Sequence, residues 1–174
     1  MRLYHTGTME IRDPDIHLGR KNADFGQGFY LTPDRAFTYR WAGPDSVVNT
    51  YELDVSGLRI QRFGRDEDWF RCVFDHRRGR DSLTADVIIG PIANDTIFET
   101  YGIVSSGFLK DEEALRLLQI GPEYMQVAIR TEKAKQQLKW LEAERIAQMD
   151  PTVKKAEEER YQALFSEAMR KMTE

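Results

Sequence analysis

The segment 19–43, GRKNADFGQGFYLTPDRAFTYRWAG, constrains the fold of this chain more than any other stretch. Three glycines interrupt its first half, and a short apolar strand is predicted directly after them, over 29–31. Backbone without side chains lets a ligand approach closely. The alternative is that the glycines only form a tight turn. The glycines concerned are Gly19, Gly26 and Gly28.

The second half of the segment predicts a helix over 33–42. Thr32 is a good N-cap because its hydroxyl can accept from a free backbone N–H, and Pro33 suits the first helical position because it has no N–H to lose. Gly43 and the proline after it end the helix. Its aromatic residues either stack on a flat ligand or fill a core. The segment therefore predicts a loop, a strand and an aromatic-lined helix in succession.

Composition is typical of one domain with an extension, since the chain has 174 residues, 41% hydrophobic and 31% charged. A net charge of −4 argues against a protein that is basic overall. The single cysteine, Cys72, lies in an apolar run and is expected to be a buried, inert thiol. No Cys/His cluster suggests a zinc site, and no metal is expected. No stretch is long and apolar enough to span a membrane, so no membrane partner and a cytoplasmic location are expected.

The rest of the chain predicts an α+β fold, because short strands mix with helices without regular βαβ alternation. Helices are expected at 66–79, 97–101 and 111–120, and a long helical stretch is expected to begin at the cap residue Thr131. Further strands are predicted over 1–6, 47–55, 58–63, 86–90 and 125–130.

Asp150 and Pro151 interrupt the C-terminal helical stretch, and a second charged helix runs from there to the end of the chain. An apolar stripe on that helix must pack on the domain or on another chain, and pairing of these helices would give a homo-oligomer. We divide the chain into a domain over 1–141 and a charged amphipathic helical extension over 142–174. The stripe consists of Tyr161, Leu164, Phe165, Ala168 and Met172.

Several motifs together resemble a known superfamily. YHTG at 4–7, PDI-x-x-GRKNADFGQGFYLT at 14–32, the RWA run, GPIANDTI at 90–97 and the late QVAIRTEKA run span most of the chain from Leu3 to Leu138. They resemble an uncharacterised bacterial family within the ADP-ribosyltransferase superfamily of the His-Tyr-Glu type. The resemblance implies a split core of mixed and antiparallel sheets with flanking helices.

The resemblance also implies an activity and a cofactor. It implies an enzyme that takes NAD as a substrate and moves ADP-ribose to a target with release of nicotinamide. By the superfamily pattern, His5 contacts the adenine-side ribose, Gly7 binds the nicotinamide amide through its backbone, and Tyr30 stacks on nicotinamide. The inserted Thr6 departs from the usual His-Gly pair. In the poly-ADP-ribose branch of the superfamily, a serine eight residues after the tyrosine holds the nicotinamide amide, and an aromatic residue eleven residues after it completes the stacking on nicotinamide. These two positions fall on Thr38 and Trp41. Together with residues chosen for their own chemistry or their place in the loops, the NAD-binding set that we expect is His5, Thr6, Gly7, Arg20, Phe25, Gly26, Gly28, Tyr30, Thr38, Trp41, Asn94 and Asp95.

The third motif residue is normally a glutamate, and its position falls on Gln126, which we place with Tyr30 and His5 in the catalytic set. A carboxylate stabilises the oxocarbenium-like charge that develops on the ribose, and a glutamine can only hydrogen-bond. Three outcomes stay open: a weaker transferase, a transferase that recruits another carboxylate, or an NAD-binding protein without transfer. Candidate replacement carboxylates are Glu123, Asp95 and Asp24.

Two other groups of residues have a functional and a structural interpretation. Asn94 and Asp95 either form a turn or line the cleft. Arg20 is expected to bind the NAD pyrophosphate, since guanidinium pairs with phosphate oxygens, while Lys21 stays open.

The segment Arg59–Arg80 carries seven arginines among aromatic residues, which suits contact with a nucleic acid, although such runs are more often solvated helix faces. The sequence thus predicts a mono-ADP-ribosyltransferase acting on a protein or a nucleic acid. A bacterial toxin or defence effector with an antitoxin-like protein partner is one form that such an enzyme takes. The alternative is a non-catalytic module that binds NAD, ADP-ribose or nucleic acid.

Overall fold

Two β-sheets form the centre of the structure, a computed structural model that describes residues 1–93 and 111–173. Sheet A has the antiparallel order β1 (Arg2–Gly7), β3 (Val47–Leu53) and β7 (Leu138–Arg145). Sheet B has the order β2 (Phe29–Leu31), β6 (Met125–Ile129), β5 (Val87–Pro91) and β4 (Ile60–Arg62), in which the β4–β5 pair alone is parallel. The protein is therefore α+β with a split sheet core.

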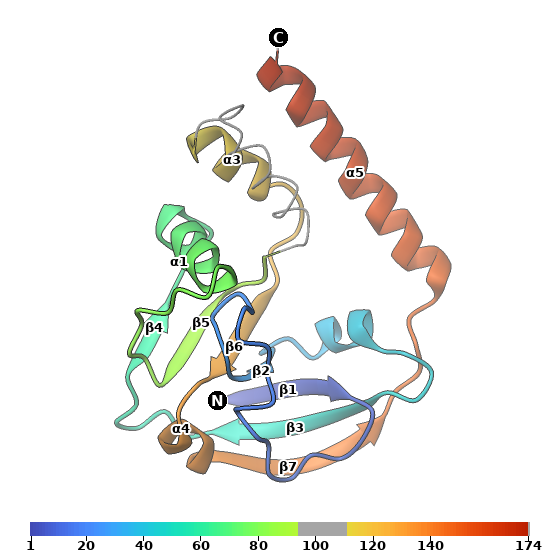
Figure 1. Ribbon diagram of the computed structural model, residues 1–174. Coiled ribbons are helices and arrows are strands. Elements are labelled where there is room, and N and C mark those ends of the chain that lie inside the picture. Colours follow the sequence, from blue (N-terminus) through green and yellow to red (C-terminus); the bar gives the residue numbers. More distant parts are fainter. Residues whose placement is uncertain (94–110, 174) are drawn as a thin grey trace.

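Helices flank the two sheets (Figure 1). The 3-10 helix η1 (Ala36–Trp41) follows β2, α1 (Glu67–Arg77) lies beside sheet B, and α3 (Asp111–Leu118) precedes β6. The short α4 (Glu132–Gln136) joins β6 to β7, and α5 (Pro151–Thr173) extends away from sheet A towards α3. Within the described ranges, no helix has both the length and the apolar character needed to cross a membrane.

The space between the two sheets holds one apolar cluster, and the opposite face of sheet B holds another. Because side chains alternate along a strand, β2 sends Phe29 and Leu31 into the inter-sheet cluster and Tyr30 to the other face. Leu3 and Tyr51 of sheet A complete the inter-sheet cluster, and both are fully buried. The second cluster is formed under α1, and its buried members are Phe25, Trp69, Phe70, Val73, Ile88, Ala93, Leu118 and Ala128.

A single pair of residues connects the backbones of the two sheets among the described residues. Tyr4 on β1 and Thr32 just after β2 exchange two hydrogen bonds, with N–O distances of 2.9 Å from Tyr4 to Thr32 and 2.8 Å in the other direction. The Thr32 hydroxyl also donates to the Met125 carbonyl oxygen at 3.0 Å, which ties this point to β6. The start of β6, the end of β2 and the middle of β1 therefore meet.

Two glycines of the loop before β2 are required by close backbone packing. A Cβ built on Gly19 would lie 2.2 Å from the carbonyl oxygen of Gly28, and a Cβ on Gly28 would lie 2.7 Å from the carbonyl oxygen of Ile129. Neither side chain can be accommodated without moving backbone. The loop is thus held against β6 by contacts that only glycine allows.

The predicted start and end of α1 are confirmed. The Asp66 carboxylate accepts from the backbone N–H of Trp69 at 2.9 Å and so caps the helix at the residue where the predicted helix begins. Gly79 follows the helix with a φ of 75°, a conformation that favours glycine. Strands at the start of the chain and at 29–31, 47–53, 60–62, 87–91 and 125–129 also agree with prediction.

The helix predicted over 33–42 is shorter and tighter than expected. The structure forms the 3-10 helix η1, preceded by Arg35 without a side-chain cap. The Thr32 hydroxyl accepts from Asp34 N at 3.2 Å, and the Asp34 carboxylate accepts from Ala36 N at 2.9 Å. Thr32 belongs to the bridge with Tyr4, so its backbone is fixed in a strand-like pairing and the helix begins later.

The long helix predicted from Thr131 is wrong beyond Gln136. Thr131 does cap a helix, because its hydroxyl accepts from Ala134 N at 3.3 Å, but α4 spans five residues and β7 follows at once. Strand β7 pairs with the whole of β3, with a register shift between Thr50 and Tyr51. The domain boundary drawn between 141 and 142 falls inside β7, and the helical extension begins at Pro151. The helix predicted over 97–101 lies outside the described residues.

Candidate functional site

His5 lies where sheet A faces β2. Its Nδ1 is 2.7 Å from the carbonyl oxygen of Tyr30, and its ring lies 4.5 Å, centroid to centroid, from the ring of Phe29. Because a carbonyl oxygen only accepts, Nδ1 carries the proton and donates it. Burial lowers the pKa of His5, which the hydrogen bond to Tyr30 only partly opposes. The neutral ring therefore keeps Nε2 as an unprotonated acceptor at neutral pH.

The Nε2 edge of His5 lies against Gly7. A Cβ on Gly7 would lie 3.6 Å from both Cδ2 and Nε2 of His5, so a ligand at this edge would contact the Gly7 backbone as well. Thr6, between them, donates from its hydroxyl to the carbonyl oxygen of Thr38 at 3.1 Å. The structure thus brings His5, Thr6, Gly7 and Thr38 together at the junction of β1 and η1.

Thr38 and Trp41 of η1 have opposite surroundings. The Thr38 hydroxyl donates to the carbonyl oxygen of Arg35 at 2.6 Å, and only 1% of the residue is exposed, so this hydroxyl stabilises η1 instead of facing a ligand. Trp41 is 63% exposed and meets the Phe37 ring edge-on at 5.9 Å. Of the two, Trp41 is the residue that offers a flat ring to solvent.

Tyr30 holds the glycine-rich loop through its hydroxyl. The hydroxyl donates to the carbonyl oxygen of Gly26 at 2.7 Å and accepts from the backbone N–H of Phe25 at 3.0 Å. Burial raises the pKa of this phenol, so it stays protonated. Phe25 is fully buried in the cluster under α1, and Gly26 and Gly28 are also buried. These three predicted NAD-binding residues shape the loop and do not form an open ligand surface.

Gln126 is buried on the same face of sheet B as Tyr30, since Tyr30 pairs with Ala128 two residues further along β6. Its side-chain nitrogen donates to Oδ2 of Asp24 at 2.8 Å and to the carbonyl oxygen of Pro91 at 3.3 Å. The sequence named Asp24 as a candidate replacement carboxylate, and the structure places it in direct contact with Gln126. His5 and Gln126, in contrast, lie on opposite faces of β2.

The Asp24 carboxylate is fully engaged. Its Oδ1 lies 2.6 Å from Nη2 and 2.8 Å from Nε of Arg77, and its Oδ2 also accepts from Ala93 N at 2.9 Å. Side-chain exposure is 8% for Arg77 and 9% for Asp24. A buried paired ion of this kind is stabilised by its counter-ion and its hydrogen bonds together. The carboxylate, the guanidinium and the Gln126 amide form a cluster without net charge.

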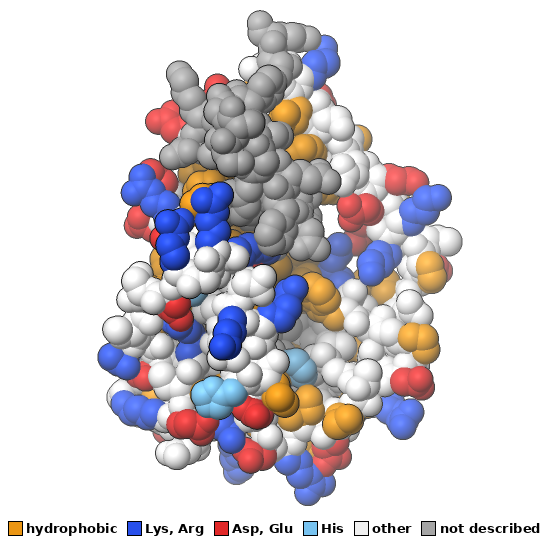
Figure 2. Space-filling model, viewed as in Figure 1, with side chains coloured by type: hydrophobic (Ala, Val, Ile, Leu, Met, Phe, Trp, Pro, Cys, Tyr) orange, Lys and Arg blue, Asp and Glu red, His pale blue; other side chains and the backbone are white. Residues whose placement is uncertain are grey.

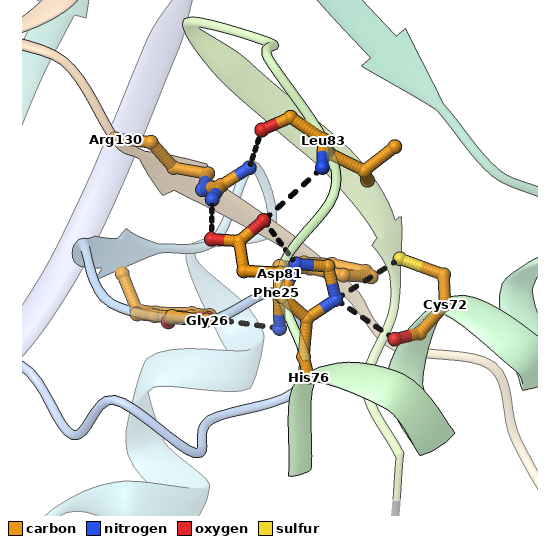
Figure 3. Close-up of polar contacts among 8 residues, drawn as sticks. Phe25, Gly26, Cys72, His76, Asp81, Leu83 and Arg130 are labelled. Carbon is orange, nitrogen blue, oxygen red and sulfur yellow. Dashed lines mark hydrogen bonds and ion pairs between the residues drawn. The ribbon is translucent and has the colours of Figure 1, made fainter. Parts of the chain in front are cut away.

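A second polar cluster supports the same loop from the other side (Figure 3). His76 of α1 contacts the carbonyl oxygen of Cys72 through Nδ1 at 2.8 Å and Oδ1 of Asp81 through Nε2 at 3.1 Å. Asp81 also pairs with Arg130, which follows β6. A Cβ on Gly26 would lie 2.9 Å from the His76 ring, so the loop rests on this ring. Burial raises the pKa of the Cys72 thiol to about 12, as expected for an inert thiol.

Arginines of the segment 59–80 mainly bind other parts of the protein. Arg65 donates to the carbonyl oxygens of Gln119, Gly121 and Pro122, and Arg77 is buried against Asp24. Most of the others pair with acids or lie on an aromatic ring: Arg59 with Asp86, Arg71 with Glu67, Arg80 with Asp75, and Arg78 over Phe74. The segment therefore has little unpaired basic surface among the described residues.

A hollow opens on the face of the molecule shown in Figure 2, between the loop that precedes β2, η1 and the end of β1, with basic side chains around it. Arg20 of that loop is exposed, and its side chain makes no hydrogen bond or ion pair within the described parts of the chain. It is thus free to meet a phosphate. Asn94 and Asp95 lie outside the described residues. Among residues 1–93 and 111–173, no group of three or more His, Cys, Asp or Glu side chains is arranged to hold a metal ion.

The arrangement provides two hydrogen-bond acceptors, an exposed indole and an exposed guanidinium. The acceptors are Nε2 of His5 and Oε1 of Gln126, and the latter makes no hydrogen bond with the described residues. Each of these two acceptor atoms can accept a hydrogen bond from a hydroxyl of a sugar. His5 and Gln126 both belong to the catalytic set that the sequence predicts. The supporting partners Asp81 and Arg130 carried no signal that singled them out.

One protein-family model, described as "Protein of unknown function (DUF3990)", matches residues 1–140. The match covers β1 to β6 and the beginning of β7, and thus all the candidate residues above. No curated protein matches the chain.

Proposed function

The chain belongs to the DUF3990 family, whose description gives no function, and we propose, from the site and the motif resemblance, that it is an NAD-dependent mono-ADP-ribosyltransferase. The proposed reaction breaks the glycosidic bond between ribose and nicotinamide. Nicotinamide leaves with the electron pair of that bond, and a nucleophile on the target forms the new bond to the ribose carbon. A protein or a nucleic acid serves as target.

The observation that carries this proposal is the state of His5. Its Nδ1 is occupied by the Tyr30 carbonyl oxygen, and burial keeps the ring neutral, so Nε2 can accept a ribose hydroxyl beside the Gly7 backbone. This is the role that the superfamily resemblance implies for His5.

The other groups have complementary roles in the proposal. Exposed Trp41 supplies a ring for stacking, and exposed Arg20 supplies a cation for the pyrophosphate. Gln126 accepts from the 2′-hydroxyl of the nicotinamide-side ribose through Oε1, while His5, on the other side of β2, accepts from the adenine-side ribose. An amide oxygen orients the hydroxyl but gives less stabilisation to an oxocarbenium-like transition state than a carboxylate, so slow turnover is expected.

Transfer of label from adenylate-labelled NAD tests the proposal. Purified protein is incubated separately with cell protein, RNA and DNA, together with His5→Ala and Gln126→Ala variants. The matched control is His17→Ala, because the side chain of His17 is 69% exposed. We expect label on one fraction, a loss of about 10²-fold in rate in the first two variants, and an unchanged rate in the control.

A second candidate function, a non-catalytic module that binds NAD or ADP-ribose, is favoured by one observation. The Asp24 carboxylate, which contacts Gln126, is already neutralised by Arg77. Binding of NAD by calorimetry without label on any fraction would support this module and contradict the transferase.

The role of α5 in this proposal is to hold a protein partner. The helix contacts the domain through an ion pair between Glu157 and Arg40 and through Tyr161, which packs against Gly121. Leu164 stays 45% exposed. A toxin or defence role with an antitoxin-like partner, and self-association through α5, both stay predictions. Gel filtration with and without residues 150–174 tests self-association, which an unchanged apparent size per chain would contradict.

A further inference from the structure

We propose that Asp24 is a positioning residue that turns the amide oxygen of Gln126 towards the substrate. The inference rests on the proposed function, because it concerns the acceptor that the ribose hydroxyl would meet. It also explains why the position carries glutamine and not glutamate.

The orientation of the Gln126 amide follows from its partners. Oδ2 of Asp24 and the carbonyl oxygen of Pro91 lie 2.8 Å and 3.3 Å from the side-chain nitrogen. Both partners are acceptors only, and a carboxamide nitrogen has two hydrogens. The nitrogen must therefore face them, and Oε1 is left as the atom that can bind a hydroxyl.

Asp24 is fixed firmly enough to impose this orientation. The guanidinium of Arg77 binds Oδ1 through two nitrogens, and Ala93 N binds Oδ2 at 2.9 Å. Arg77 is fixed in turn, because Nη2 donates to the carbonyl oxygen of Ala93 at 3.0 Å. The neighbouring Phe25 N–H is held by the Tyr30 hydroxyl. Loop, helix α1 and strand β6 thus meet at one carboxylate.

A glutamate cannot take the place of Gln126 while Asp24 is present. The two carboxylates would share a buried site with 2.8 Å between the contacting atoms of the present pair. Like charges at that distance cannot both ionise, so one carboxyl would hold a proton. The single guanidinium of Arg77 balances one carboxylate, so a glutamate at 126 would leave the cluster neutral only while one of the two carboxyls is protonated.

Exchanging the two groups tests the inference. In Asp24→Asn, residue 24 has one acceptor atom left, and this amide oxygen best serves Arg77. The amide nitrogen at position 24 then faces Gln126, whose amide turns over and points its nitrogen outwards. In the double variant Asp24→Asn with Gln126→Glu, the new carboxylate accepts from the amide nitrogen at position 24, while Ala93 N and the Pro91 carbonyl oxygen each lose the partner that they have in the wild type. The second oxygen of the new carboxylate can then accept from a substrate hydroxyl, as Oε1 of Gln126 does in the proposal. The exchange also keeps one negative charge near Arg77.

The measurements are label transfer and urea unfolding across pH for wild type, both single variants and the double variant. Glu52→Gln is the matched control, because Glu52 is an exposed acid on β3. We expect about a 10²-fold loss of kcat in Asp24→Asn with little change of KM, and recovery of at least about tenfold in the double variant. A purely structural role for Asp24 would give no such recovery.

The unfolding series tests the contact by itself. In Gln126→Glu the raised pKa of one carboxyl should make stability fall as pH rises from about 4 to 7, relative to wild type. The double variant should lose this slope. If Asp24→Asn does not fold, the Gln126→Glu variant tests the inference by itself. A free energy of unfolding that varies with pH in parallel to that of wild type overturns the inference.

The outcomes separate the two proposals. Wild-type transfer that is unchanged in Asp24→Asn overturns the inference and leaves the transferase in place. No transfer by wild type overturns the proposed function, and with it the role of Asp24 in presenting an acceptor.

Discussion

Arg77 on α1 places Nη2 2.6 Å from Oδ1 of Asp24 in the glycine-rich loop, and both side chains are more than nine-tenths buried. The pair joins the helix to the loop in front of sheet B. Its loss should lower the free energy of unfolding.

Replacing Arg77 by methionine should destabilise the fold by about 3–5 kcal/mol, because it leaves the buried Asp24 carboxylate without its counter-ion. Arg62→Met serves as the control, since Arg62 is exposed on β4. Urea unfolding of both variants measures the difference. Equal midpoints for the two would show that the ion pair contributes no net stability.

His5 should make stability depend on pH. Its pKa is lower in the folded protein than the usual 6.5, so the unfolded chain binds more protons as pH falls. The contribution of His5 is present above pH 6.5 and is lost as pH falls through the folded-state pKa. We expect the difference in stability between wild type and His5→Asn to narrow or reverse from pH 7 to pH 5, since the introduced amide can still donate to the Tyr30 carbonyl oxygen. His17→Asn is the matched control, because the side chain of His17 is 69% exposed. The same change of the stability difference with pH in that variant would contradict the assignment of the effect to His5.

Gly19→Ala should cost roughly 3 kcal/mol, because the new methyl group would lie 2.2 Å from the Gly28 carbonyl oxygen and backbone must move. Gly43→Ala is a matched substitution, as the nearest atom to its Cβ would be 3.9 Å away. Thermal unfolding should show a lower Tm for the first and a Tm near wild type for the second. Comparable values would mean that the loop adjusts freely.

Two truncations should separate the domain from the helical extension. A chain ending at residue 149 keeps β7 and the buried Ile146 and should fold. A chain ending at residue 141 loses the half of β7 that pairs with Val47–Thr50 and should lose roughly 3 kcal/mol or more. Circular dichroism and urea unfolding compare them. Equal stability would place the end of the folded domain at 141.

Local patterns predicted most strands, because alternation and bounding glycines are sequence-local. Strand β7 was missed for a physical reason. Its sequence, LKWLEAER, consists largely of good helix formers, and only pairing with β3 makes it a strand. Half-buried Trp140, which donates to Oδ1 of Asn49 at 3.2 Å, is part of that pairing. Tertiary contacts therefore outweighed local propensity.

In the candidate site too, local motifs predict single residues but not the long-range contacts between them. His5 and Gln126 were located from motifs, and the structure places both on sheet strands as expected. The Asp24–Gln126 contact joins residues 102 positions apart, and no local pattern indicates such a pair. The sequence predicts Arg77 only as part of a basic segment, because its burial against Asp24 depends on how α1 packs on the loop.

The bridge between Tyr4 and Thr32 has a consequence for motion. Each sheet is hydrogen-bonded internally along its strands, while this one exchange of two hydrogen bonds joins their backbones among the described residues. Rotation of one sheet against the other about this point would leave every strand ladder intact and change the width of the hollow beside η1. The apolar residues between the sheets oppose a wide opening, so we expect the bridge to act as a pivot of small amplitude. Its amide protons should then exchange with solvent faster than those in the centre of β3.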